Sequence, residues 1–177
     1  DIKGTTLLTN GVKMPYFGLG VFEAEPGAEV IQAIHWALEA GYRHIDTASL
    51  YGNEESVGEA IRTSGIPRDE IFVTTKIWNS DQGYQSALDA FRTSMDKLGL
   101  DYVDLYLVHW PVRDKYEKTW EALEEIYQKK QARAIGVSNF LAHHLEVILE
   151  RNGIPPMVNQ VEFHPYLVQN DLIRYCK

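Results

Sequence analysis

The sequence predicts an α/β fold: a (β/α)8 TIM barrel preceded by an N-terminal β-hairpin, with about six strand–helix units present. Strand-like segments rich in β-branched and aromatic residues alternate with amphipathic segments. The starts of the strand-like segments are spaced by roughly 24 to 32 residues, which is typical of a repeating strand–helix unit. Polar side chains also stand at the ends of several of these segments, where such a barrel carries its reactive groups.

The elements are expected in the following order. Residues 5–11 and 12–17 form a hairpin, because Asn10-Gly11 tolerates positive φ in a tight turn, and a strand follows at 17–22. Hydrophobic periodicity then predicts helices over 28–40, 54–64, 84–98, 118–129, 141–152 and from 169 onward. The intervening strands are predicted over 42–48, 71–78, 103–110, 134–138 and 157–163. Glycines that would cap the ends of four helices are Gly41, Gly65, Gly99 and Gly153.

A doubly wound open sheet is the competing arrangement. It would normally carry a glycine-rich phosphate-binding turn after its first strand. Gly18-Leu19-Gly20 lacks a third glycine at the required spacing, so the barrel is favoured. A closed barrel needs eight units and typically about 250 residues. We therefore expect residues 1–177 to form a single domain that is incomplete at its C-terminal end.

The composition limits the kinds of binding partner and cellular setting that we expect for this protein. The net charge of −8 argues against a nucleic-acid partner, and no apolar run approaches the ~20 residues of a membrane helix. The single cysteine, Cys176, cannot form an internal disulfide, which favours a reducing, cytoplasmic setting. A metal site is not expected, because His44-Ile45-Asp46 lacks the second histidine of a metal-binding pair.

Three titratable residues end predicted strands, namely Asp46, Lys76 and His109, and Tyr51 lies in the loop after the first of them. A phenol, with a pKa near 10, is a weak acid at neutral pH, but a nearby ammonium stabilises the phenolate. At ~4 Å and an effective dielectric of ~20 the two charges interact by about 4 kcal/mol, so Lys76 could lower the pKa of Tyr51. Asp46 would keep Lys76 charged, and a neutral His109 could orient a carbonyl oxygen. This set suits protonation of an oxygen after hydride transfer from a nicotinamide cofactor.

Each residue also has an ordinary structural interpretation. Asp46 could cap a turn, Lys76 could be a surface residue and His109 a structural histidine, so only their convergence favours a functional site. A Schiff-base aldolase that uses Lys76 is a rival; it requires a lowered lysine pKa, and Asp46 predicts the opposite. A non-catalytic nicotinamide-binding module and an inactive fragment of a reductase are two further candidates.

Several motifs resemble those of the aldo-keto reductases. The stretch 41–48, followed by Glu54 and by Val57-Gly58, resembles the first signature of that family, and 133–140 resembles the second. Shorter matches occur at 18–20, 75–79, 108–111 and 159–162. The resemblance covers the whole chain in order.

The resemblance implies a barrel capped by the hairpin, a cytoplasmic monomer and NADPH/NADP+ as cofactor. It implies reduction of small aldehydes and ketones, or 2-oxoaldehydes, and is strongest to bacterial glyoxal, methylglyoxal and diketogluconate reductases. Tyr51 would be the general acid, with Asp46, Lys76 and His109 completing the catalytic set. The implied cofactor-binding residues are Gly20, Val21, Phe22, Asp46, Ser138, Asn139 and Gln160. The implied substrate-binding residues are Phe22, Trp78, His109 and Trp110.

The sequence departs from the family pattern in two places. Lys130-Gln131 stands where the family usually has Gly-Lys, so a helix C-cap glycine is missing, at an expected cost of a few tenths to about 1 kcal/mol. The family segment that binds the adenosine 2′-phosphate would lie beyond Lys177. The choice of NADPH over NADH is therefore a family expectation, and we expect little or no activity from these 177 residues alone.

Overall fold

The computed structural model describes residues 2–177 and contains two sheets. The first is an antiparallel hairpin of β1 (Thr5–Leu7) and β2 (Lys13–Pro15). The second has six parallel strands, and each strand pairs with the next one along the chain. These strands are β3 (Leu19–Gly20), β4 (His44–Asp46), β5 (Phe72–Ile77), β6 (Val103–Val108), β7 (Ala132–Ser138) and β8 (Asn159–Gln160).

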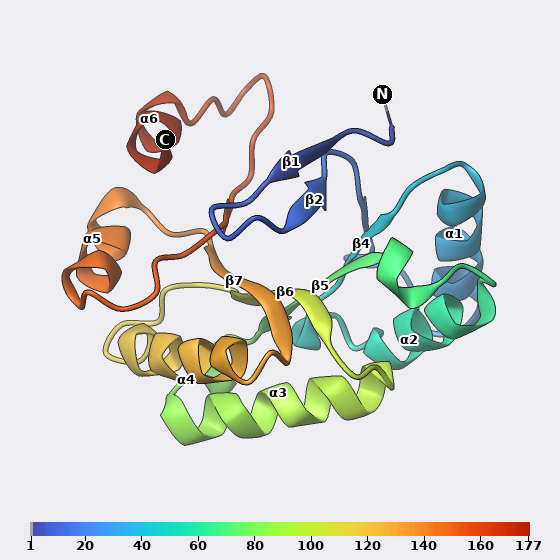
Figure 1. Ribbon diagram of the computed structural model, residues 1–177, viewed down its shortest axis with the longest axis horizontal. Helices are drawn as coiled ribbons and strands as arrows, with labels where there is room; N and C mark the ends of the chain where they lie inside the picture. The colour runs from blue at the N-terminus through green and yellow to red at the C-terminus, as the bar shows by residue number, and fades with distance from the viewer. Residues whose placement is uncertain (1) are drawn as a thin grey trace.

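The order of the strands separates the two predicted arrangements. A doubly wound sheet reverses its strand order at a switch point, whereas here the order runs β3-β4-β5-β6-β7-β8 without reversal. The sheet is therefore a partial (β/α)8 barrel, as predicted. Figure 1 shows α2, α3 and α4 packed along the strands, with the hairpin on the side away from them. The helices are α1 (Ala28–Glu39), α2 (Glu54–Thr63), α3 (Tyr84–Leu98), α4 (Tyr116–Gln128), α5 (Ala142–Glu150) and α6 (Asn170–Cys176).

The core lies between the sheet and the helices. Strands β5 and β6 are buried along their whole length, and the face of β6 toward the helices presents Tyr106 to Phe91 of α3, with ring centroids 4.8 Å apart. Asp104 is the buried charge in β6. Its carboxylate accepts hydrogen bonds from Arg68 Nη2 at 2.8 Å, Arg133 Nη1 at 2.7 Å and the Val73 N–H at 2.9 Å, so the charge is fully paired.

The two outer strands of the sheet are shorter than predicted. The strand expected over 17–22 is limited to β3, and the strand expected over 157–163 is limited to β8. Each has a sheet neighbour on one side only, so half of its backbone groups lack a ladder partner. Three short 3₁₀ turns, at Ser49–Tyr51, Arg68–Glu70 and Asn79–Asp81, were not anticipated from the sequence.

Three of the four predicted glycine caps adopt positive φ, at Gly41 (100°), Gly65 (74°) and Gly99 (60°). The prediction for Gly153 was wrong, because Asn152, with φ 54°, takes the left-handed position after α5 instead. After α4, Lys130 holds this position with φ 60°, as the missing glycine implied. None of the helices within residues 2–177 combines the length and apolar character needed to cross a membrane.

Candidate active site

The structure brings the four predicted catalytic residues to one end of the sheet. Asp46 ends β4, Lys76 lies near the end of β5, and His109 directly follows β6. Tyr51 is supplied by the turn Ser49–Tyr51 that follows β4. Asp46, Tyr51 and His109 line a cavity of about 620 Å³ that also runs past the base of the hairpin.

Lys76 forms the buried centre of this group, with 1% of its surface exposed. Its ammonium forms an ion pair with Asp46 Oδ1 and donates to the Thr47 carbonyl at 3.0 Å. It also lies 3.4 Å from the Tyr51 hydroxyl oxygen. Burial lowers the pKa of Lys76, and Asp46 opposes that shift without cancelling it. The expectation that Asp46 would dominate was therefore wrong, because desolvation of the ammonium is the larger effect.

The pKa of Tyr51 also differs from the one expected from the sequence. Burial and the negative charge of Asp46 raise the pKa of Tyr51 to about 12, although Lys76 is close. The prediction of a lowered phenol pKa was wrong, because burial of the phenol, reinforced by the Asp46 carboxylate, disfavours the phenolate. Tyr51 consequently holds its proton throughout the neutral range, so it can act as a proton donor, although it is a weaker acid than a free phenol.

His109 is neutral at neutral pH, as predicted. Burial and the nearby charge of Lys76 lower the pKa of His109 to about 4. Its ring centroid lies 5.8 Å from that of Tyr51 and 5.1 Å from that of Trp78, with both contacts edge-on. The buried Nδ1 atom of His109 has no hydrogen-bond partner among residues 2–177.

The residues expected to hold the nicotinamide lie along the same cavity. Ser138, Asn139 and Gln160 line it together with Gly20. The Gln160 amide donates to Asp46 Oδ2 at 2.8 Å, and the Asn139 amide donates to the His109 carbonyl at 3.1 Å. Asn139 has φ 61°, a conformation that asparagine tolerates better than most residues.

Of the remaining predicted residues, some lie at the cavity that Tyr51 lines and others do not. Phe22 is 62% exposed and packs its ring 5.0 Å from that of Tyr51. Val21 is buried, its N–H donates to the Asp46 carbonyl at 3.1 Å, and it does not line the cavity that Tyr51 lines, so its cofactor role stays a prediction. Trp78 contacts His109 but lines the neighbouring cavity rather than the one lined by Tyr51. Trp110 is 46% exposed, and its carbonyl accepts from Gln82. The substrate roles of both tryptophans stay predictions.

Reasoning from the sequence missed the residues that hold the Tyr51 turn. The buried Asn53 donates to the Val21 carbonyl at 2.9 Å and accepts from the Thr47 hydroxyl at 2.7 Å. The Ser49 hydroxyl donates to the Lys76 carbonyl at 3.0 Å, and Glu54 accepts from Thr75 at 2.6 Å. These bonds tie the turn to β5 and to Val21, the residue that follows β3. Nothing in the spacing of Asn53 or Ser49 could have revealed partners so far apart in sequence.

Known proteins share the sequence and the fold of this chain. The model of the aldo/keto reductase family matches residues 16–177. The chain belongs to the aldo-keto reductase family. The glyoxal reductase of Bacillus subtilis is 56% identical over 177 residues, which are 100% of this chain and 64% of that protein. The 9,11-endoperoxide prostaglandin H2 reductase of Trypanosoma cruzi is 57% identical over 170 residues, covering 96% of this chain and 60% of that protein.

Solved structures of aldo-keto reductases superpose closely on the chain. The aldo/keto reductase of Brucella melitensis has a TM-score of 0.94 at 49% identity, covering 97% of this chain and 68% of that one. A Bombyx mori aldo-keto reductase solved in complex with NADP has a TM-score of 0.90 at 38% identity, covering 98% and 62%. The chain thus spans between 60% and 64% of the length of the two curated aldo-keto reductases named above.

Proposed function

We propose that this aldo-keto reductase chain forms the acid–base part of an enzyme that reduces small aldehydes and ketones, including 2-oxoaldehydes, with NADPH. The observation that carries the proposal is the arrangement around Tyr51. A phenol that stays protonated lies 3.4 Å from a buried ammonium and edge-on to a neutral imidazole, at the wall of an open cavity.

The residues on the cavity wall fit a nicotinamide. Asn139 and Gln160 donate their amide hydrogens within the protein, and no hydrogen bond within residues 2–177 engages their side-chain oxygens. Those oxygens suit the amino group of a carboxamide, and the Ser138 hydroxyl lies beside them, 3.1 Å from the Asn139 amide. Gly20 adds no side chain, and a Cβ at that position would meet nothing within 4 Å, so the wall there is open. When bound, the reduced nicotinamide would supply the hydride.

The protein's own residues would perform the proton transfer. A neutral His109 can donate a hydrogen bond to the carbonyl oxygen of the substrate and hold it toward Tyr51. Tyr51 then donates its proton to the oxygen as negative charge develops there. The ammonium of Lys76 stabilises the resulting phenolate, and Asp46 keeps that ammonium in place.

Lys76 is poorly placed to act instead as a Schiff-base nucleophile. Its lowered pKa removes the argument from the sequence against that role, but its ammonium is held by Asp46, Thr47 and Tyr51. Treatment with a carbonyl substrate and borohydride should therefore leave Lys76 unmodified, as mass spectrometry of its peptide can determine. A stable adduct on Lys76 would favour an aldolase.

The substrate class rests on the open cavity and on the relatives. Phe22 and Tyr51 present aromatic surface at the cavity wall, and the cavity is open enough for a small carbonyl compound beside a cofactor. The name of the Bacillus subtilis relative, glyoxal reductase, supports a 2-oxoaldehyde as the first substrate to assay.

The test is Tyr51→Phe in the full-length protein, with Tyr16→Phe as the matched control. Tyr16 lines the same cavity but is exposed at the hairpin. Loss of the proton donor should reduce kcat for glyoxal reduction by about 100-fold or more, while NADPH binding measured by fluorescence is unchanged. Tyr16→Phe should behave like the unsubstituted protein. Full activity in Tyr51→Phe would refute the assignment, and cofactor binding without turnover in the unsubstituted protein would favour a non-catalytic binding module.

A further inference from the structure

A strained turn presents Phe22 to the candidate active site. The turn runs from Val21 to Ala24, whose N–H donates to the Val21 carbonyl at 3.3 Å. Glu23, inside the turn, has φ 61°, a left-handed conformation that a residue with a Cβ adopts only at a cost. Such conformations persist where the surrounding structure holds them. The turn leaves Phe22 62% exposed at the cavity wall, with its ring 5.0 Å from that of Tyr51.

The side chain of Asn53 holds this turn. Asn53 is 1% exposed, and its amide donates to the Val21 carbonyl at 2.9 Å and to the Ala24 carbonyl at 3.4 Å. One amide thus engages both ends of the turn. The Asn53 Oδ1 atom accepts from the Thr47 hydroxyl at 2.7 Å, which fixes the orientation of the amide. The Asn53 side chain therefore joins the turn to the residue that follows β4.

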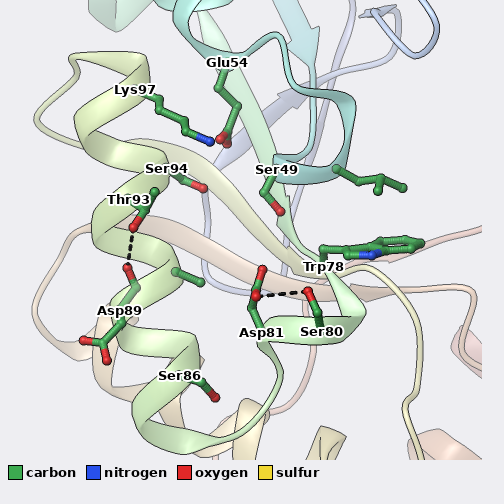
Figure 2. Close-up of a pocket in the computed structure, with 12 residues that line it drawn as sticks. Ser49, Glu54, Trp78, Ser80, Asp81, Ser86, Asp89, Thr93, Ser94 and Lys97 are labelled. Atoms are coloured by element: carbon green, nitrogen blue, oxygen red, sulfur yellow. Dashed lines mark hydrogen bonds between the residues drawn. The ribbon is translucent and has the colours of Figure 1, made fainter.

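This use of Asn53 is unusual for its position. Asn53 is the N-cap residue of α2, and asparagine is favoured at an N-cap because its side chain normally bonds to the first turn of the helix. Within residues 2–177 the Asn53 side chain makes no such bond. Glu54 holds the start of α2, because it accepts from Thr75 of β5 at 2.6 Å and reaches toward Lys97 of α3 (Figure 2). The Asn53 amide is thereby committed to the turn that carries Phe22.

We propose that Asn53 is a positioning residue that holds Phe22 beside Tyr51 and thereby sets the affinity of the site for aldehydes that carry an aromatic group. This role of Asn53 rests on the function proposed above, because it concerns a carbonyl substrate in the same cavity. The exposed ring of Phe22 offers a packing surface to a second ring and little to glyoxal, which has no ring. Without the Asn53 amide, Glu23 would relax toward negative φ. That change would carry Phe22 away from Tyr51.

The test is a double-mutant cycle of Asn53→Ala and Phe22→Ala in the full-length protein, with KM measured for benzaldehyde and for glyoxal. Each single substitution should raise the KM for benzaldehyde about tenfold, because a ring contact is lost, and change the KM for glyoxal by less than about threefold. The double variant should have the same KM as either single one, since Asn53 acts through Phe22. A general structural defect would weaken both substrates and would add to the effect of Phe22→Ala.

Thr47→Val and Thr119→Val provide a matched pair of conservative variants. Both threonines are fully buried, and the hydroxyl of each joins two segments: that of Thr47 donates to Asn53, and that of Thr119 accepts from the Gly83 N–H at 2.9 Å. Thr47→Val should raise the KM for benzaldehyde about threefold, because the Asn53 amide loses its fixed orientation. Thr119→Val should leave that KM unchanged. Thr47→Val decides the outcome if circular dichroism shows that Asn53→Ala is unfolded.

Three kinetic results would overturn this role of Asn53. They are an equal rise in KM for the two aldehydes, additive effects in the double variant, and an unchanged KM for benzaldehyde in Asn53→Ala. If the unsubstituted protein reduces neither aldehyde, the proposed function fails, and nuclear magnetic resonance decides the role of Asn53 separately. A nuclear Overhauser effect between the Phe22 and Tyr51 rings should be present in the unsubstituted protein and in Thr119→Val, and absent in Asn53→Ala. Its persistence in Asn53→Ala would overturn the inference.

Discussion

At the scale of single residues, burial and charge compete at each titratable group of the candidate site. Burial raises the pKa of Tyr51 and lowers those of Lys76 and His109, and Asp46 reinforces the first shift while it opposes the other two. All three shifts favour the neutral form of the group. The net result is a protonated phenol beside a neutral imidazole, which is the pair needed to protonate a carbonyl oxygen.

The lowered pKa of His109 makes stability depend on pH. In the unfolded chain the imidazole takes up a proton below about pH 6.5, whereas in the folded protein it stays neutral down to about 4. The free energy of unfolding should therefore fall as pH drops from about 6.5 toward 4, by roughly 1–2 kcal/mol from this group. Urea denaturation at about pH 7 and pH 5.5 measures it.

His109→Gln should weaken this pH dependence, because the variant has no group to protonate at that position. His164→Gln is the matched control, since His164 is far more exposed and lies in the segment after β8. Its pH dependence should match that of the unsubstituted protein. An unchanged slope in His109→Gln would contradict the assignment of a lowered pKa to His109.

The left-handed Lys130 gives a second prediction at this scale. Its φ of 60° strains a residue with a Cβ, so Lys130→Gly should raise the free energy of unfolding by about 0.5–1 kcal/mol. Lys129→Gly is the matched comparison, because Lys129 has φ −76° and gains nothing from glycine. Lys129→Gly should instead lower stability by about 0.5 kcal/mol. Thermal denaturation of both variants checks the pair, and a destabilised Lys130→Gly would show that the left-handed residue carries no strain.

At the scale of elements, α2 is the helix that follows the Tyr51 turn. Its position is fixed by close packing against the end of α3. Gly58 permits this approach: a Cβ built there would lie 1.9 Å from the Leu98 carbonyl oxygen. This explains the glycine of the first family signature physically, since the obstacle is backbone and cannot rotate away. The turn itself is then tied to its neighbours by Asn53 and Ser49.

Gly58→Ala should accordingly lower the free energy of unfolding by about 3 kcal/mol or more, because the two helices must separate to admit the methyl group. Glu59→Ala, on the exposed side of the same helix, should change stability by less than about 0.5 kcal/mol. Urea denaturation of both variants provides the measurement. A Gly58→Ala protein as stable as Glu59→Ala would mean that the two helices are not in close contact.

At the scale of the whole molecule, the stability of the sheet is concentrated in its centre. Strands β5, β6 and β7 run for six or seven residues and are almost wholly buried, whereas β3 and β8 each have two residues. Native-state hydrogen exchange should therefore be slowest in β5–β7 and faster by orders of magnitude in β3, β8 and the hairpin. Uniform protection across all six strands would contradict a sheet organised around its central strands.

Local patterns in the sequence were enough to predict the alternation of strands and helices, the choice of a barrel over a doubly wound sheet, and the family. Those properties follow from hydrophobic periodicity and from contiguous motifs, which are local. The sequence also indicated that Asp46, Tyr51, Lys76 and His109 would meet, because strand ends in a parallel sheet share one edge. The same locality explains why Lys130 could be identified as the site of a missing glycine cap.

The electrostatics and the supports of the site, by contrast, depend on the tertiary structure. The pKa shifts of Tyr51 and Lys76 depend on how deeply each group is buried, and no pattern of residue types encodes that depth. The hydrogen bond from Asn53 to the Val21 carbonyl likewise depends on a partner that lies far away in the sequence. The bounds of β3 and β8 are likewise set by tertiary structure, because a strand extends only as far as its backbone pairs with a neighbouring strand, and local sequence does not show where that pairing stops.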